Sequence, residues 1–264
     1  MATTPRALTL RRHLCPSPRV RPNVLNTPPP WPTISGVSSG TTTADALSTM
    51  PPKPRLRGRL HQASFIASMA AGATLVTTAA ITSSGLAVAA TAVYVATVLG
   101  LFGISSLYHR WPWRSERSRS WMRRLDHSMI FLFIAGTYTP VAAMALGSNT
   151  RVVVLAVVWG GALGGVALQL VWPRAPRWVG VPFYLALGYV ALFVLPDLWR
   201  QAGATALILL LAGGLLYTIG AVCYAIRRPN PWPETFGFHE FFHAATVLAA
   251  LCHYVAIWFV LVSS

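Results

Sequence analysis

Acidic residues are scarce in this 264-residue chain, with six Asp and Glu against 21 Lys and Arg, and only 10% of all residues are charged. Soluble domains usually carry about 25% charged residues, so an ordinary soluble fold is excluded. The three cysteines show neither disulfide nor zinc-finger spacing, which excludes a disulfide framework. The abundant class is apolar, at 54% of the chain.

The net charge of +15 does not indicate a nucleic-acid partner. The basic residues cluster in loops between apolar runs, as they do on the cytoplasmic side of membrane proteins. We therefore expect these loops to contact anionic lipid headgroups.

Residues 1–52 differ from the rest because they are rich in Pro, Ser, Thr and Arg and lack apolar periodicity. Such a composition predicts a disordered tail. It has no continuous apolar core of a secretory signal, and it loosely resembles an Arg-rich organelle transit peptide. The alternative is that the biological start is Met50. Residues 53–264 are expected to form one membrane domain.

Seven apolar runs of helical length predict an all-α membrane protein, a seven-transmembrane helix bundle. The fifth run contains Pro182 and is followed by Pro196, which membrane helices tolerate when neighbours satisfy the freed backbone groups. Small residues in the fourth and sixth runs predict close helix packing. The runs are Gln62–Ser83, Leu86–Tyr108, Asp126–Leu146, Val152–Trp172, Val179–Leu195, Ala202–Ile226 and His239–Val262.

The distribution of Lys and Arg predicts the orientation. Counted from residue 53 on, fourteen of them precede the first run or follow the second, fourth and sixth, whereas only Arg151 and Arg200 lie in the other loops. The excess of positive charge marks the cytoplasmic side, so the N-terminus is predicted to be cytoplasmic and the C-terminus extracytoplasmic. We expect a multi-pass integral protein of the plasma membrane.

Five polar residues stand at the predicted cytoplasmic ends of three runs: Ser105 and His109, Asp126, and His239 and His243. Ionisable groups at membrane depth are costly and mark functional sites by default. Because an even number of runs separates the relevant ends, all five fall on the same side of the membrane. The sequence therefore predicts one shared site.

Three imidazoles predict a zinc site of the catalytic type, with His109, His239 and His243 as ligands. His239 and His243 are four residues apart and share one helix face. Zinc would generate a nucleophile from water at neutral pH. Asp126 is then expected to accept that water's proton or to orient the water. Ser105 is expected to hydrogen-bond to the water, to a ligand or to the substrate. Alternatively, Asp126 only pairs with Arg123 or Arg124.

His239–His243 also fits the H-E-x-x-H pattern of zinc proteases. Glu240 could be a general base, but capping the start of its helix is the simpler role. The other histidines are not expected to be ligands. His253 is about 15 Å further along the helix, and His61 and His13 are interface and tail residues. His127 points about 100° away from Asp126 on the helix and is expected to support the site or to serve in packing.

Three segments resemble the haemolysin III family, within the progestin and adipoQ receptor group: SSLYHRW at 105–111, LDHSMIFLFIAGTYTPV at 125–141 and GFHEFFHAATVLAALCHY at 237–254. The resemblance covers about residues 53–262. It implies seven helices, a cytoplasmic N-terminus and a zinc site at Ser105, His109, Asp126, His239 and His243. It also implies kinship with alkaline ceramidases and a role in membrane lipid homeostasis.

Three functions remain open from the sequence. The first is a zinc-dependent hydrolase of lipid amides or esters. The second is a receptor or sensor in which the metal only holds helix ends together. The third, a pore, requires a continuous polar lining, and the apolar runs hold too few polar residues for one.

Overall fold

The computed structural model describes Met1, residues 54–172 and residues 175–263. The predicted disordered tail, including the alternative start at Met50 and His13, lies outside the described residues apart from Met1. The chain divides into two units, residues 1–51 and 52–264, and every described helix belongs to the second.

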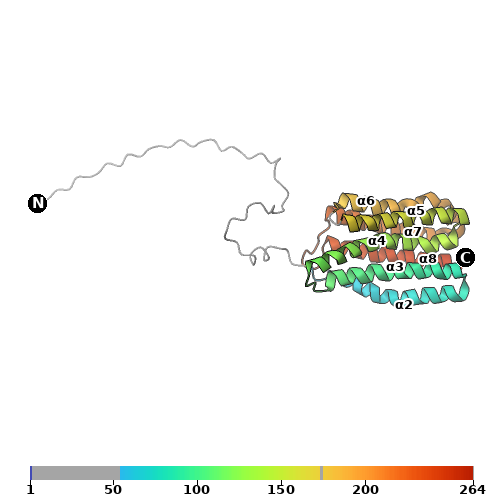
Figure 1. Cartoon of the computed structure of the whole chain (residues 1–264), viewed down its shortest axis with the longest axis horizontal. Coiled ribbons are helices and arrows are strands. Elements are labelled where there is room, and N and C mark those ends of the chain that lie inside the picture. The colour runs from blue at the N-terminus through green and yellow to red at the C-terminus, as the bar shows by residue number, and fades with distance from the viewer. Residues whose placement is uncertain (2–53, 173–174, 264) are drawn as a thin grey trace, which may run out of the picture. The chain divides into compact units, whose positions relative to one another are not determined.

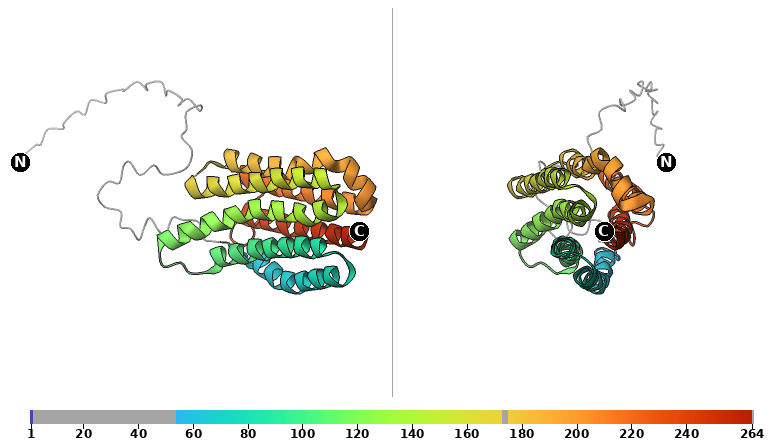
Figure 2. Two further views of the ribbon diagram at one scale, coloured as in Figure 1. Left: turned by 45° about the vertical axis from the view of Figure 1, so that its right-hand side comes forward. Right: turned by 90° about the vertical axis from the view of Figure 1, so that its right-hand side faces the viewer.

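The second unit is built from helices, with no strand among the described residues, which confirms the all-α prediction. The helix axes lie side by side, and Figure 2 shows the bundle end-on. The elements, labelled in Figure 1, are α2 (Arg59–Thr82), α3 (Gly85–Arg110), α4 (Glu116–Ala145), α5 (Ser148–Val171), α6 (Arg177–Gly188), the 3₁₀ helix η1 (Tyr189–Val194), α7 (Leu195–Ile226) and α8 (Phe238–Ser263).

Small residues allow the helices to approach closely. A side chain at Gly136 of α4 would overlap Thr97 of α3, and one at Gly165 of α5 would overlap Phe131 of α4. On α7, a side chain at Gly213 would overlap His253 of α8. The predicted inward packing of small residues in the fourth and sixth runs is thus confirmed at Gly165 and Gly213.

Six helical segments of the described residues are long and apolar enough to cross a membrane. Five of them match predicted runs one to four and seven. The remaining segment is a continuous helical stretch of 50 residues, Arg177–Ile226, which covers predicted runs five and six. The fifth run is not one regular α-helix, because α6 has only 12 residues and is followed by η1.

The 50-residue stretch folds back on itself. Arg177 at its start donates to the carbonyl of Tyr224 near its end at 3.4 Å, and the hydroxyls of Tyr189 and Thr218 are 2.9 Å apart. The reversal lies at Gly203, whose φ of 77° and ψ of 169° are not helical. Only glycine adopts such a conformation without steric cost.

Helix α4 begins ten residues before the predicted third run, at Glu116 instead of Asp126. The apolar run marks only the part of the helix that is hydrophobic, whereas the hydrogen-bonded helix continues through the polar sequence ERSRSWMRRL. Asp126 therefore does not open its helix. It lies about 15 Å along α4 from the first residue.

Candidate metal and hydrolytic site

Three histidines from two helices converge at one end of the bundle. His109 is in the last turn of α3, and His239 and His243 are in the first two turns of α8. One nitrogen from each ring lies within 4.8 Å of the others. The Nε2 atoms of His109 and His239 are 3.2 Å apart. The fold therefore brings these three histidines together, as the sequence predicted.

The histidine cluster fits the donor set that zinc prefers. Two ligands of a tetrahedral zinc ion, at Zn–N distances of about 2.0–2.1 Å, stand roughly 3.3 Å apart, close to the separation of His109 and His239. A hydrogen bond between these two rings accounts for that pair, but not for the third imidazole. Since three protein ligands converge among the described residues and a tetrahedral ion takes four, a bound ion would keep a fourth position open, as in catalytic sites.

Ser105 and Asp126 lie beside the histidine cluster. Ser105 is one turn before His109 on α3 and is buried, with 1% of its surface exposed. Its hydroxyl lies within interaction range of the carboxylate of Asp126 from α4. Oδ2 of Asp126 is 3.9 Å from Nε2 of His109. A serine, a carboxylate and three imidazoles from three helices thus share one site.

Asp126 does not pair with the neighbouring arginines. Its ion-pair contacts within the described residues are with His109 and, at 3.8 Å, with Nδ1 of His127. Arg124 instead lies over the Trp121 ring. The alternative that Asp126 serves only an arginine pair is therefore wrong. His127 donates from Nδ1 to the carbonyl of Arg123 at 2.8 Å, which makes it a neighbour of the site and not part of the cluster.

Glu240 caps α8 and is not directed at the cluster. Its carboxylate accepts the backbone N–H of Gly237 at 2.9 Å and forms an ion pair with Arg57. This is the reciprocal half of a capping box, in which the third helical residue reaches back to the residue before the helix. The simpler of the two sequence interpretations, a capping role, is confirmed, and the zinc-protease pattern is coincidental here.

Of two further histidines, His253 lies away from the cluster and His61 contacts it. His253 lies deeper in the bundle and donates to the carbonyl of Leu210 at 3.1 Å, as expected of a residue outside the cluster. The sequence placed His61 among the histidines that serve away from the cluster, and the structure corrects this. It is only 2% exposed, and its ring stacks on His243. An apolar run shows where a helix lies in the chain but not which neighbour covers its first turn.

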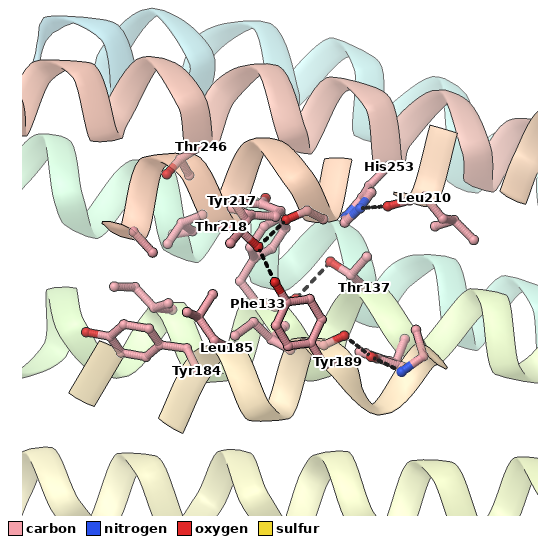
Figure 3. Close-up of a pocket in the computed structure, with 18 of the residues that line it drawn as sticks. Phe133, Thr137, Tyr184, Leu185, Tyr189, Leu210, Tyr217, Thr218, Thr246 and His253 are labelled. Carbon is pink, nitrogen blue, oxygen red and sulfur yellow. Dashed lines mark hydrogen bonds between the residues drawn. The ribbon is translucent and has the colours of Figure 1, made fainter. Parts of the chain in front are cut away.

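A cavity of about 180 Å³ extends from the cluster into the bundle. His61, Ser105, Asp126, His239 and His243 line one end. Along α4 the lining continues from Asp126 to Ala142, roughly 24 Å of helix. Most of the remaining lining is apolar or aromatic. Figure 3 shows Tyr189 and Thr218 joined by their hydrogen bond, with Phe133, Leu185 and Tyr184 around them.

A guanidinium group lies near the cluster end of this cavity. Arg177 stacks over the ring of Tyr224, 4.6 Å from its centroid, and the Tyr224 ring is 5.6 Å from that of His239. From the sequence, Arg177 is one of the positive charges of a cytoplasmic loop. Its contact with Tyr224 depends on the packing of α6 against α7, which the sequence does not show.

The long apolar helices, with a buried polar cluster at one end, define an integral multi-pass membrane protein. A sequence model of the haemolysin-III-related family matches residues 50–254. The chain therefore belongs to the haemolysin-III-related family, as its three segments predicted.

Relatives in bacteria, animals and plants share this similarity. The chain is 31% identical to hemolysin-3 of Bacillus cereus over 138 residues, 52% of this chain and 62% of the relative. It is 27% identical to the human monocyte to macrophage differentiation factor over 173 residues, 63% and 68% of the two chains. It is 29% identical to a heptahelical transmembrane protein of rice over 182 residues, 62% and 79%. The match thus spans about three fifths of the bacterial relative.

Proposed function

We propose that this protein is a zinc-dependent hydrolase of lipid amides or esters that serves membrane lipid homeostasis. The observation that carries the proposal is the position of the three-histidine cluster. It lies beside a buried carboxylate and serine at the polar end of a long apolar cavity.

In this proposal His109, His239 and His243 hold the ion. When bound, zinc supplies Lewis acidity and lowers the pKa of water toward neutrality. Asp126 accepts the proton of the attacking water and later delivers it to the leaving group, the usual double duty of a general base. Ser105, one turn before His109 on α3, orients the Asp126 carboxylate in this proposal by donating its hydroxyl proton in a hydrogen bond.

The cavity supports a substrate with one long apolar chain. Its lining along α4 spans roughly 24 Å, enough for on the order of 19 carbon atoms of an extended chain, which advances about 1.25 Å per bond. Arg177, near the cluster end, suits an anionic or carbonyl group of the same lipid. The apolar lining also argues against an aqueous pore.

The proposal includes seven spans, with the N-terminus in the cytoplasm and the C-terminus outside. The reversal at Gly203 supports counting the 50-residue stretch as two spans, and the name of the rice relative describes seven helices in that protein. The arginines of the cytoplasmic loops then lie on the inner face of the plasma membrane, where anionic lipids attract them.

The test is release of fatty acid from a panel of acyl amides and esters by the zinc-loaded protein in detergent. Turnover that disappears on removal of zinc with a chelator, and returns with added zinc, is the expected result. A protein that holds zinc but turns over none of the panel would instead be a metal-stabilised receptor or sensor.

A further inference from the structure

The segment before α2 lies against the histidine cluster. The N–H groups of Arg55 and Leu56 donate to the carbonyls of Glu234 and Thr235, at 2.9 and 3.2 Å. This ties the segment to the loop that leads into α8. This segment and the first three residues of α2, together residues 55–61, are called the N-terminal clasp from here on.

Arg57 continues the attachment. Its guanidinium pairs with Glu240, whose carboxylate is 1% exposed and also holds the N–H of Gly237. Glu240 directly follows His239 in the first turn of α8. The N-terminal clasp therefore fixes the turn that carries one of the three histidines.

Gly58 brings the N-terminal clasp into direct contact with α3. A Cβ atom at this position would stand 2.7 Å from the Cβ of His109, closer than such atoms approach. The φ of 78° at Gly58 is also one that favours glycine. The backbone of the N-terminal clasp thus packs against the second histidine.

His61 completes the contact at the third histidine. Its ring lies 3.8 Å from that of His243, centroid to centroid, with the planes only 11° apart. The ring of Phe102 also contacts it in an edge-to-face arrangement, with the two ring centroids 5.1 Å apart. Neither ring nitrogen of His61 has a side-chain hydrogen-bond partner among the described residues.

The stacked geometry separates positioning from ligation. A metal bound by an imidazole lies in the plane of that ring, along the nitrogen lone pair. Two nearly parallel rings stacked face to face share no such point, so one ion cannot be bound by both His61 and His243. The face of His61 meets the ring of His243, and no hydrogen bond joins the two rings.

We propose that His61 is a positioning residue of the metal site, which fixes the ring plane of His243 and so the direction of its nitrogen. This inference rests on the proposed metal site. Residues that orient metal ligands without touching the metal typically change metal affinity 10- to 100-fold when removed. They usually act through hydrogen bonds, whereas His61 acts through its ring face.

The experiment measures zinc affinity by chelator competition on the full chain in detergent. His61→Ala removes the stacked ring and is expected to weaken zinc binding about 10- to 100-fold. His61→Phe keeps a flat ring and removes both nitrogens, and is expected to bind zinc almost as tightly as the parent. The Co²⁺ absorption spectrum, which reports the ligand set, should be the same in the Phe variant and the parent.

Leu75→Ala is the matched control, because Leu75 is fully buried on the same helix, roughly 21 Å further along. It should lower the melting temperature without changing zinc affinity. Equal weakening by His61→Phe and His61→Ala, or equal weakening by Leu75→Ala, would overturn the positioning role. If the parent protein binds no zinc, the proposed function fails first. If it binds zinc and His61→Ala does too, unchanged, only the inference about His61 fails.

Discussion

Replacing Asp126 by Asn tests the proposed chemistry at one atom. Oδ2 of Asp126 lies 3.9 Å from Nε2 of His109, so its carboxylate is next to the proposed metal ligands. Asn has nearly the same shape, and its side-chain oxygen can still accept the hydroxyl of Ser105. It cannot take up a proton. Fold and metal content should therefore survive the change, and proton transfer should not.

The expected loss is that of a general base, about 10²–10⁴-fold in turnover. This corresponds to roughly 3–5 kcal/mol in the activation free energy. The assay follows fatty acid release from the best acyl amide or ester of the panel. Zinc content and melting temperature are measured on the same preparations, so that a loss of metal is not mistaken for a loss of chemistry.

Glu116→Gln provides the control on the same helix. Glu116 is 91% exposed and its ion pair among the described residues is with Arg119 of its own helix, so its loss should leave turnover unchanged. Wild-type turnover in Asp126→Asn with full zinc content would refute the role of Asp126. A loss of turnover accompanied by a loss of zinc would show that Asp126 is needed to hold the metal.

Three further outcomes are expected. His239→Ala and His243→Ala should each remove most of the zinc found by elemental analysis, and full occupancy in both would disprove the assignment of the ligands. A reporter after Ser264 should read extracytoplasmic and one in the Arg114–Arg124 loop cytoplasmic, so the same reading from both would contradict the count of seven spans. A chain that starts at Met50 should insert and bind zinc like the full chain, because it keeps the N-terminal clasp, whereas failure to insert would make the tail a targeting element.

Much of the fold follows from the sequence because the bilayer restricts what an apolar run can become. Backbone groups must be satisfied internally in hydrocarbon, so runs of this length form helices. The residues at which these helices begin and end were less predictable. The helix that holds Asp126 starts at Glu116, because backbone hydrogen bonding continues where hydrophobicity stops. Runs five and six became one helical stretch, because a single glycine conformation at Gly203 suffices for the reversal.

The sequence by itself determined which residues meet in the histidine cluster. His239 and His243 share a helix face through their spacing of four, and the number of runs places His109 on the same side. Only the tertiary structure decided what surrounds the cluster. His61 reaches His243, Arg57 reaches Glu240, and Arg177 reaches Tyr224 across 182, 183 and 47 residues of chain. Such contacts depend on which helix faces pack together, and local periodicity does not carry that information.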